Sequence, residues 1–152
     1  MIIMTEQKYE KILVPVDGSK SAEKALMKAI DIVKRNGGHL DILNVIDLKQ
    51  FSSSFGGIMD LSGDIIYQTF EDVQEYLDEL ENTVKENGVD DVAVHARYGS
   101  PKTIIANDFV NDHKIQLIVM GSTGLNVVER MLVGSVTDYV VRTAKCDVII
   151  AK

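Results

Sequence analysis

The architecture of this chain follows from one segment near its start, Lys11-Ile12-Leu13-Val14-Pro15-Val16-Asp17-Gly18-Ser19. Its short apolar run ends in turn-forming residues, which predicts a buried strand and then a tight turn. Ser19 suits the N-cap of a helix, and apolar residues recur at helical spacing up to Val33. Asn36-Gly37-Gly38 predicts the end of that helix, because glycine adopts the left-handed conformation without steric cost. The chain therefore begins with a strand–helix unit.

The same unit repeats along the chain. Apolar runs predict further strands at residues 40–46, 92–98, 115–120 and 147–152, and helical patterns occupy about 66–84 and begin again at Ser100-Pro101 and near Ser135. Four strand–helix units and a last strand predict an α/β three-layer sandwich, a five-stranded, mostly parallel sheet between two helical layers. Strand orders 3-2-1-4-5 and 2-1-3-4-5 both fit, and the alternation in residues 92–98 favours the first, with that strand at an edge.

The pattern predicts one domain over residues 1–152, with residues 1–8 as a flexible extension. Residues 47–62 contain Ser52-Ser53-Ser54 and Gly56-Gly57, and a loop of that length is typically functional or mobile. Ser100 is expected to cap its helix, with Pro101 as the first helical residue.

Composition narrows the possible function. The 152 residues are 45% hydrophobic and 26% charged, with a net charge of −7, and they include one cysteine. Eight acids against one lysine between residues 63 and 88 account for that charge, which indicates a solvated helix face. An acidic balance argues against nucleic-acid and anionic-membrane binding. Without a signal-like start or a long apolar run, the chain is expected to be soluble and cytoplasmic.

Three glycines after the fourth strand have a spacing that can serve chemistry: Gly121, Gly124 and Gly134, the last followed by Ser135. Glycine lets the backbone approach a ligand closely, and a helix beginning at Ser135 would offer unpaired amides to a phosphate. Ser135 and Asp138 also fit a capping box. Ligands in such sheets bind where the strand order reverses, here between strands one and four. The spacing alone fits a phosphate site and a set of ordinary turn glycines with a helix cap equally well.

Together these segments resemble the universal stress protein family over residues 11–152. The matching pieces are 12–19, Leu43-Asn44-Val45-Ile46-Asp47, Gly99-Ser100-Pro101 with Ile104-Ile105, and 118–124 with Gly134-Ser135-Val136-Thr137. The glycine spacing is similar to that of the ATP-binding branch of the family. The resemblance implies an adenine nucleotide alpha hydrolase-like, or Rossmann-like, fold.

The resemblance also implies where the ligand would bind. Adenine and ribose contacts fall on Pro15, Val16, Asp17 and Val45. The phosphate cradle falls on Met120, Gly121, Ser122, Gly124, Gly134, Ser135, Val136 and Thr137. The ligand would be ATP, or AMP or ADP, with Mg²⁺, and Asp17 would contact the ribose or the ion, or else only cap the first helix. Met120 fits an adenine contact and a core position almost equally.

The chain lacks both the Gly-x-x-x-x-Gly-Lys-[Ser/Thr] loop and Gly-x-Gly-x-x-Gly. Arg130 is the one base between Gly121 and Ser135, so binding is better supported than turnover. We therefore expect a nucleotide-dependent regulatory protein of the stress response with no catalytic residue. A slow ATPase or phosphotransferase and a dimeric scaffold with a vestigial site are the alternatives.

The remaining residues of interest favour structural roles. His39, His95 and His113 lie on different elements without metal-ligand spacing, and we expect them at the surface or at a sheet edge. Cys146 is expected to be a packing residue. The apolar run Val148-Ile149-Ile150-Ala151 at a sheet edge predicts a homodimer through the terminal strand, residues 147–151, which the resemblance also implies.

Overall fold

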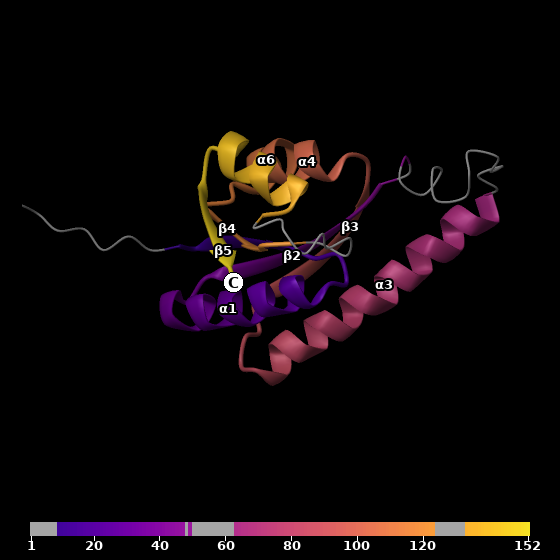
Figure 1. Cartoon of the computed structure of the whole chain (residues 1–152). Helices are drawn as coiled ribbons and strands as arrows, with labels where there is room; N and C mark the ends of the chain where they lie inside the picture. Colours follow the sequence, from indigo (N-terminus) through magenta and orange to yellow (C-terminus); the bar gives the residue numbers. More distant parts are fainter. Residues whose placement is uncertain (1–8, 48, 50–62, 124–132) are drawn as a thin grey trace, which may run out of the picture.

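The computed structural model describes residues 9–47, 49, 63–123 and 133–152. Its strands are β1 (Lys11–Pro15), β2 (His39–Ile46), β3 (Val92–Tyr98), β4 (Leu117–Gly121) and β5 (Asp147–Ala151). Its helices are α1 (Lys20–Asn36), α3 (Gly63–Glu86), α4 (Pro101–Thr103), the π-helix η1 (Ile104–Asp108), α5 (Phe109–His113) and α6 (Ser135–Thr143). Figure 1 shows the strands stacked between helices, as the alternation of patterns predicts.

The five strands form one parallel sheet in the order β3-β2-β1-β4-β5, which confirms the order favoured by the sequence. The central strand β1 pairs with β2 and with β4, and its residues Ile12, Leu13 and Val14 are fully buried. The half-buried strand β3 lies at one edge. The edge position is as expected, but residues 92–97 are all half-buried, so burial does not alternate between a protected and an accessible face along this strand.

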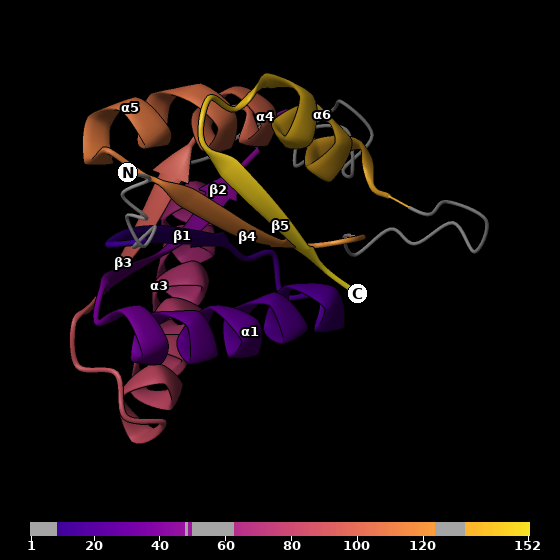
Figure 2. The same ribbon diagram turned by 90° about the vertical axis from the view of Figure 1, so that its left-hand side faces the viewer.

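Helices cover both faces of the sheet (Figure 2). One core packs α1 and α3 against the sheet around residues such as Leu26, Ile42 and Leu77. The other packs α6 and the continuous helical segment 101–113 around Phe109, with Leu43 from the sheet. The three layers follow because α1 and α3 each present one apolar face while the strands are apolar on both faces.

The first helix ends as its sequence predicts. The Oγ atom of Ser19 accepts the amide hydrogen of Ala22 at 3.1 Å, and Gly37 has the left-handed φ of +70°. Ser100 occupies the N-cap position before Pro101, but its side chain forms no capping bond. The same segment widens into η1 at residues 104–108, and such insertions are frequently found beside functional sites.

The capping box expected at the last helix is wrong. Gly134 is the N-cap of α6, Ser135 is the first helical residue, and the carboxylate of Asp138 pairs with Arg142 at 3.3 Å. The N–H of Gly134 donates to the carbonyl of Ser122 at 2.7 Å. Because this bond fixes the turn at Gly134, the helix begins at Ser135, one residue earlier than a Ser135 cap requires.

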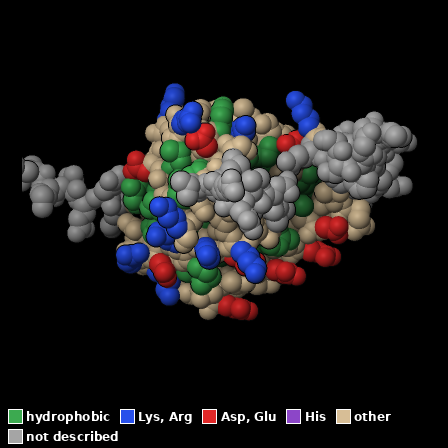
Figure 3. Space-filling model, viewed as in Figure 1, with side chains coloured by type: hydrophobic (Ala, Val, Ile, Leu, Met, Phe, Trp, Pro, Cys, Tyr) green, Lys and Arg blue, Asp and Glu red, His purple; other side chains and the backbone are tan. Residues whose placement is uncertain are grey.

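Several expectations fall on residues 1–8, 50–62 and 124–132, which lie outside the described part of the chain. They are the flexible extension, most of the 47–62 loop, Gly124 and Arg130. Among the described helices, none has the length and apolar character that crossing a membrane requires. Acidic side chains line α3 in Figure 3, whereas Lys and Arg gather over α1. The charge asymmetry predicted for residues 63–88 is thus a property of one exposed helix face.

Gly121, at the end of β4, packs directly against the start of α1. A Cβ atom on Gly121 would lie 2.6 Å from the carbonyl carbon and 2.7 Å from the carbonyl oxygen of Ser21, and still closer to the Ser21 Oγ atom. Backbone atoms inside a helix cannot move aside cheaply. The glycine is therefore required here by the contact between a strand and a helix.

We expect Gly121→Ala to lower the free energy of unfolding by about 1–3 kcal/mol, the usual cost of overpacking a closed contact. Urea denaturation would measure the loss. Gly37→Ala is the comparison, because Gly37 has open space around it and only its positive φ opposes alanine. Adding Ser21→Ala should recover little, since the clashing backbone atoms remain. Equal stability of Gly121→Ala and the unmodified chain would contradict the packing role.

Candidate functional site

A cavity of about 410 Å³ lies at the carboxyl ends of the strands, where β1 and β4 meet. This is the point at which the strand order reverses, and connecting segments leave to opposite faces of the sheet there. The volume falls within the range of small-molecule sites. The predicted position of the site is therefore hollow in the folded chain.

One side of the cavity is apolar. It is lined by Pro15, Val16, Leu43, Val45, Pro101, Ile105 and Met120. The ends of β1 and β2 are fixed beside it, because the N–H of Val16 donates to the carbonyl of Leu43 at 2.8 Å and the Asn44 side-chain amide donates to the carbonyl of Val16 at 2.9 Å. These contacts make the apolar wall a rigid surface suited to a flat aromatic ring.

Asp17 brings a carboxylate to the cavity at the turn after β1. One of its oxygens, Oδ1, accepts the amide hydrogen of Ser19 at 3.0 Å, and Ser19 in turn caps α1. Asp17 therefore orders the turn and does not itself cap the helix. The Ser19 hydroxyl supplies the cap, so of the two roles left open for Asp17 the helix cap belongs to Ser19.

The start of α6 supplies a second part of the cavity lining. Gly134, Ser135, Val136 and Thr137 line it, and the first helical bond there joins the Asp138 N–H to the Gly134 carbonyl. The amides of residues 135–137 precede that bond, so they have no partner within the helix. Together with the positive end of the helix dipole, they favour an anion.

Among the described residues, two hydrogen bonds hold the two ends of the β4–α6 connection together: the Gly134–Ser122 bond, and the bond that the Thr137 hydroxyl donates to the carbonyl of Gly121 at 2.9 Å. The Thr123 N–H donates to Ser21 Oγ at 3.3 Å, which joins the connection to α1. Thr137 is buried, and it lines the cavity while its hydroxyl is engaged by the Gly121 carbonyl. The amide of Gly134 is likewise occupied by Ser122.

All of the ligand contacts expected from the sequence line the cavity except Ser122 and Gly124. Ser122 contributes a carbonyl to the Gly134 bond, and Gly124 lies outside the described residues. Met120 combines both roles considered for it, because it is 5% exposed and also lines the cavity.

Sequence reasoning did not single out several lining residues as ligand contacts: Ser19, Ala22, Leu43, Asp47, Pro101, Ile105 and Thr123. Two signals could have found some of them: the period-two relation of Leu43 to Val45, and the four-residue spacing from Pro101 to Ile105 on a helix.

The three histidines are half-buried, and His95 lies on the edge strand β3, as expected. Their different elements nevertheless bring them together around one carboxylate, which the sequence did not predict. The Nε2 atoms of His39 and His95 lie 3.0 and 2.8 Å from Oδ1 of Asp41, a residue 1% exposed in the middle of the sheet. His113 approaches from the end of α5, its ring stacked on Phe109 at 4.0 Å. We call Asp41, His39, His95 and His113 the polar cluster. Residues 54 apart in sequence meet here only because β2 and β3 are neighbours.

The cluster controls the ionisation of its buried carboxylate. Desolvation by burial opposes the charge of Asp41, but hydrogen bonds from His95 and His39, with the charges of His39 and Lys11, outweigh it and lower its pKa to about 2. At His113 burial lowers the pKa of the imidazole, while the charge of Asp41 opposes that change. Asp41 is thus a stable anion within the protein.

Cys146 has the packing role that the sequence indicates. It is half-buried against the core around Phe109, and burial raises the pKa of its thiol. A raised thiol pKa disfavours the reactive thiolate.

Comparisons with known proteins agree with this architecture. The model of the universal stress protein family matches residues 8–152. A relative named "Putative universal stress protein" from Staphylococcus aureus (strain USA300) is 40% identical over 148 residues, covering 95% of this chain and 84% of its own.

Solved structures share the fold. Universal stress protein UspA from Lactobacillus plantarum has 31% identity and a TM-score of 0.79, covering 97% of this chain and 100% of its own. A universal stress protein in complex with cAMP has 24% identity and a TM-score of 0.69, covering 95% and 97% of the two chains. The universal stress protein from Archaeoglobus fulgidus in complex with dAMP has 23% identity and a TM-score of 0.66, covering 96% of this chain and 100% of its own. With a matching family model over nearly its whole length and a close relative in the same family, the chain belongs to the universal stress protein family.

Proposed function

We propose that this protein binds an adenine nucleotide, with ATP and Mg²⁺ as its ligands, and that it acts in the cytoplasm as a nucleotide-dependent regulator of the stress response. The observation that carries the proposal is the cavity itself, which joins an apolar wall to the unpaired amides at the start of α6. A nucleotide has the same two-sided chemistry, an aromatic base at one end and phosphates at the other.

The base would lie against the apolar wall formed by Val16, Val45 and Ile105. Two solved members of the family hold adenine nucleotides, cAMP in one and dAMP in the other. Their shared adenine group supports the choice of base for this chain. The triphosphate is proposed from the glycines between β4 and α6 and from the anion-favouring helix start.

Mg²⁺ would be held by the phosphates, and Asp17 is the lining residue whose carboxylate best suits the ion as a protein ligand. A carboxylate is a preferred Mg²⁺ ligand, and Asp17 lines the cavity with one oxygen engaged by Ser19. The second oxygen fits the role of an ion or ribose contact. When bound, the ion would neutralise phosphate charge, while the chain's own amides orient the phosphates.

Regulation is favoured over turnover by the chemistry of the described lining. Asp17 and Asp47 are its charged residues, and lysine, arginine and histidine are absent from it. Phosphoryl transfer requires positive charge on the transferring group, from a protein cation or a metal, together with an oriented nucleophile. A slow ATPase remains the alternative, and measurable turnover above that of a binding-deficient variant would favour it.

Gly134→Val tests the nucleotide site. The backbone of Gly134, at φ −68° and ψ 160°, accommodates a valine, so the fold should survive. The added side chain would enter the phosphate side of the cavity that Gly134 lines. We expect ATP affinity, measured by calorimetry with Mg²⁺, to fall at least about tenfold, or about 1.4 kcal/mol. Gly124→Val should act in the same direction.

Thr143→Val is the control, because it lies at the opposite end of α6 and is nearly isosteric. It should leave ATP affinity unchanged. Unaltered affinity in both glycine variants, with circular dichroism showing intact folds, would refute this location of the phosphates.

We further propose a homodimer through β5. This strand lies at an edge of the sheet, where backbone groups are available to a second chain. Val148, Ile149 and Ile150 are half-buried, and Val141 on the neighbouring helix α6 is 47% exposed. A two-fold axis would pair β5 antiparallel to its copy and cover these apolar side chains.

Ile149→Lys should convert the dimer to monomer or aggregate, because a lysine charge at the paired edge resists burial. Sedimentation velocity at tens of micromolar would report the change. Met27→Lys is the matched control: Met27 is an exposed apolar residue, 45% accessible, on α1. That variant should remain dimeric, and a monomeric unmodified protein would overturn the proposed assembly.

A further inference from the structure

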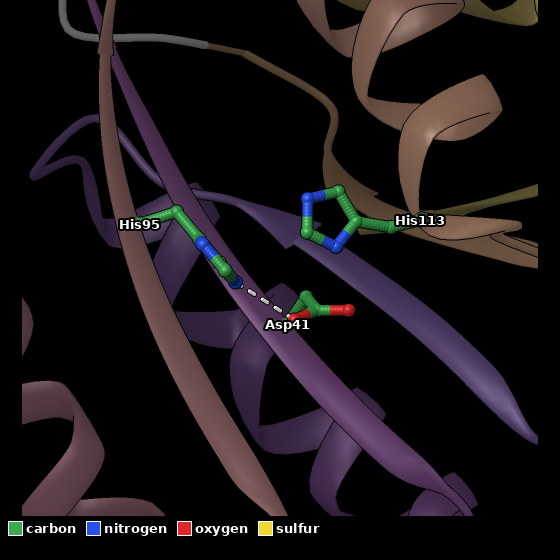
Figure 4. Close-up of side chains that lie close together, drawn as sticks. All are labelled: Asp41, His95 and His113. Carbon is green, nitrogen blue, oxygen red and sulfur yellow. Dashed lines mark hydrogen bonds and ion pairs between the residues drawn. The ribbon is translucent and has the colours of Figure 1, made fainter.

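We propose that Asp41, His95 and His113 bind one divalent transition-metal ion, with Zn²⁺ as the probe of choice, at a site separate from the nucleotide cavity. Figure 4 shows the three side chains turned toward one another from β2, β3 and the end of α5. One ligand atom from each lies within 4.8 Å of the others. None of the three lines the cavity at the ends of β1 and β4.

The spacing suits a single ion after small side-chain rotations. Ligand atoms held tetrahedrally about 2.0–2.1 Å from zinc are about 3.3–3.5 Å apart. His95 Nε2 and Asp41 Oδ1 are closer than this, at 2.8 Å, and the ring centroids of His95 and His113 are 5.1 Å apart. Asp41 is held within the sheet, so the two imidazoles would have to rotate to bring the three ligand atoms to the distances that zinc requires.

A metal ligand at position 113 must be a neutral imidazole with one ring nitrogen free of hydrogen. Arg97 can only donate, so its contact of 3.2 Å with Nε2 of His113 indicates that Nε2 is the acceptor and that Nδ1 carries the proton in the metal-free protein. A metal bound at Nε2 would displace Arg97, and one bound at Nδ1 would require the ring proton to move to Nε2 with loss of the same contact. Two imidazoles with one carboxylate are typical ligands of Zn²⁺ and its neighbours, whereas Mg²⁺ and Ca²⁺ prefer oxygen alone.

Groups around the three ligands hold them in place. His39 lies between two carboxylates, with Nε2 3.0 Å from Asp41 and Nδ1 2.6 Å from Asp91, so it steadies the central carboxylate from outside the ligand set. Partners of this kind orient ligands in metal sites. His113 also ends the helical segment 101–113, where the helix dipole favours a positive charge.

Two cations compete with a metal at this site. Lys11 Nζ lies 3.4 Å from Oδ2 of Asp41, and its side chain is 33% exposed, so it can swing into solvent. Arg97 contacts Nε2 of His113, but it also lies 3.6 Å from Asp112 and over the ring of Phe109, and these two contacts can hold it when a metal takes its place at the imidazole. Lys11 competes for the carboxylate itself, so its removal should strengthen metal binding.

The test uses the full chain, free of nucleotide, titrated with ZnCl₂ by calorimetry and with CoCl₂ by visible absorption. We expect one ion per chain and a cobalt spectrum perturbed by nitrogen ligands, with little response to MgCl₂. His95→Gln and His113→Gln should each weaken Zn²⁺ binding at least about tenfold. Lys11→Met should tighten it, a result that a purely structural hydrogen-bond network would not produce.

His39→Gln is the matched control, because it removes an imidazole from the same carboxylate oxygen but from outside the ligand set. It should keep the one-to-one stoichiometry and lose less affinity than either ligand variant. Circular dichroism would check each fold. An unperturbed cobalt spectrum in the unmodified protein would overturn the proposal, whatever the variants do. Binding shared with MgCl₂ and unaffected by His113→Gln would also overturn it, and would point to the acidic face of α3.

Discussion

The pairing of β1 with both β2 and β4 is the constraint on which the rest of the molecule depends. It places the start of the sequence at the centre of the sheet, and it sets the reversal of strand order beside β1. The chain leaves β1 toward α1 on one face, whereas the chain leaving β4 continues into α6 on the other (Figure 2). A divergence of this kind leaves room for a ligand between the two strands, and the cavity at the ends of β1 and β4 lies there.

Gly121, at the end of β4, has a packing role in addition to the ligand-binding role expected for it. A glycine between a strand and the next helix is usually interpreted as room for a phosphate, but a Cβ atom on Gly121 would collide with the backbone of Ser21. Close contact between β4 and α1, together with the bond from Thr137 to the Gly121 carbonyl, brings the start of α6 to the crevice. The packing of one glycine thus supports the geometry of the whole phosphate side.

The two polar regions of the sheet differ in how they are built. The nucleotide cavity uses backbone amides and apolar walls at the carboxyl ends of the strands, so it places little charge of its own inside the protein. The polar cluster concentrates a buried carboxylate and three imidazoles beneath α5. A carboxylate in that position is retained as an anion only because its hydrogen bonds exceed the cost of its burial. Such an anion is a feature that packing alone does not require.

Local sequence patterns were enough to predict the strand–helix order, the position of β1 inside the sheet and the edge position of β3. These depend on periodicity and on turn residues such as Gly37, whose effects act within a few residues. Most of the cavity lining was instead predicted from the resemblance to a known family. The sequence by itself did not determine the start of α6, because the bond between Gly134 and Ser122 joins residues across a long connection. It also did not determine the wall formed by Pro101 and Ile105, or the meeting of Asp41, His95 and His113. Those depend on which strands become neighbours and on how a helix lies across them, and spacing along the chain carries no record of distances set by tertiary packing.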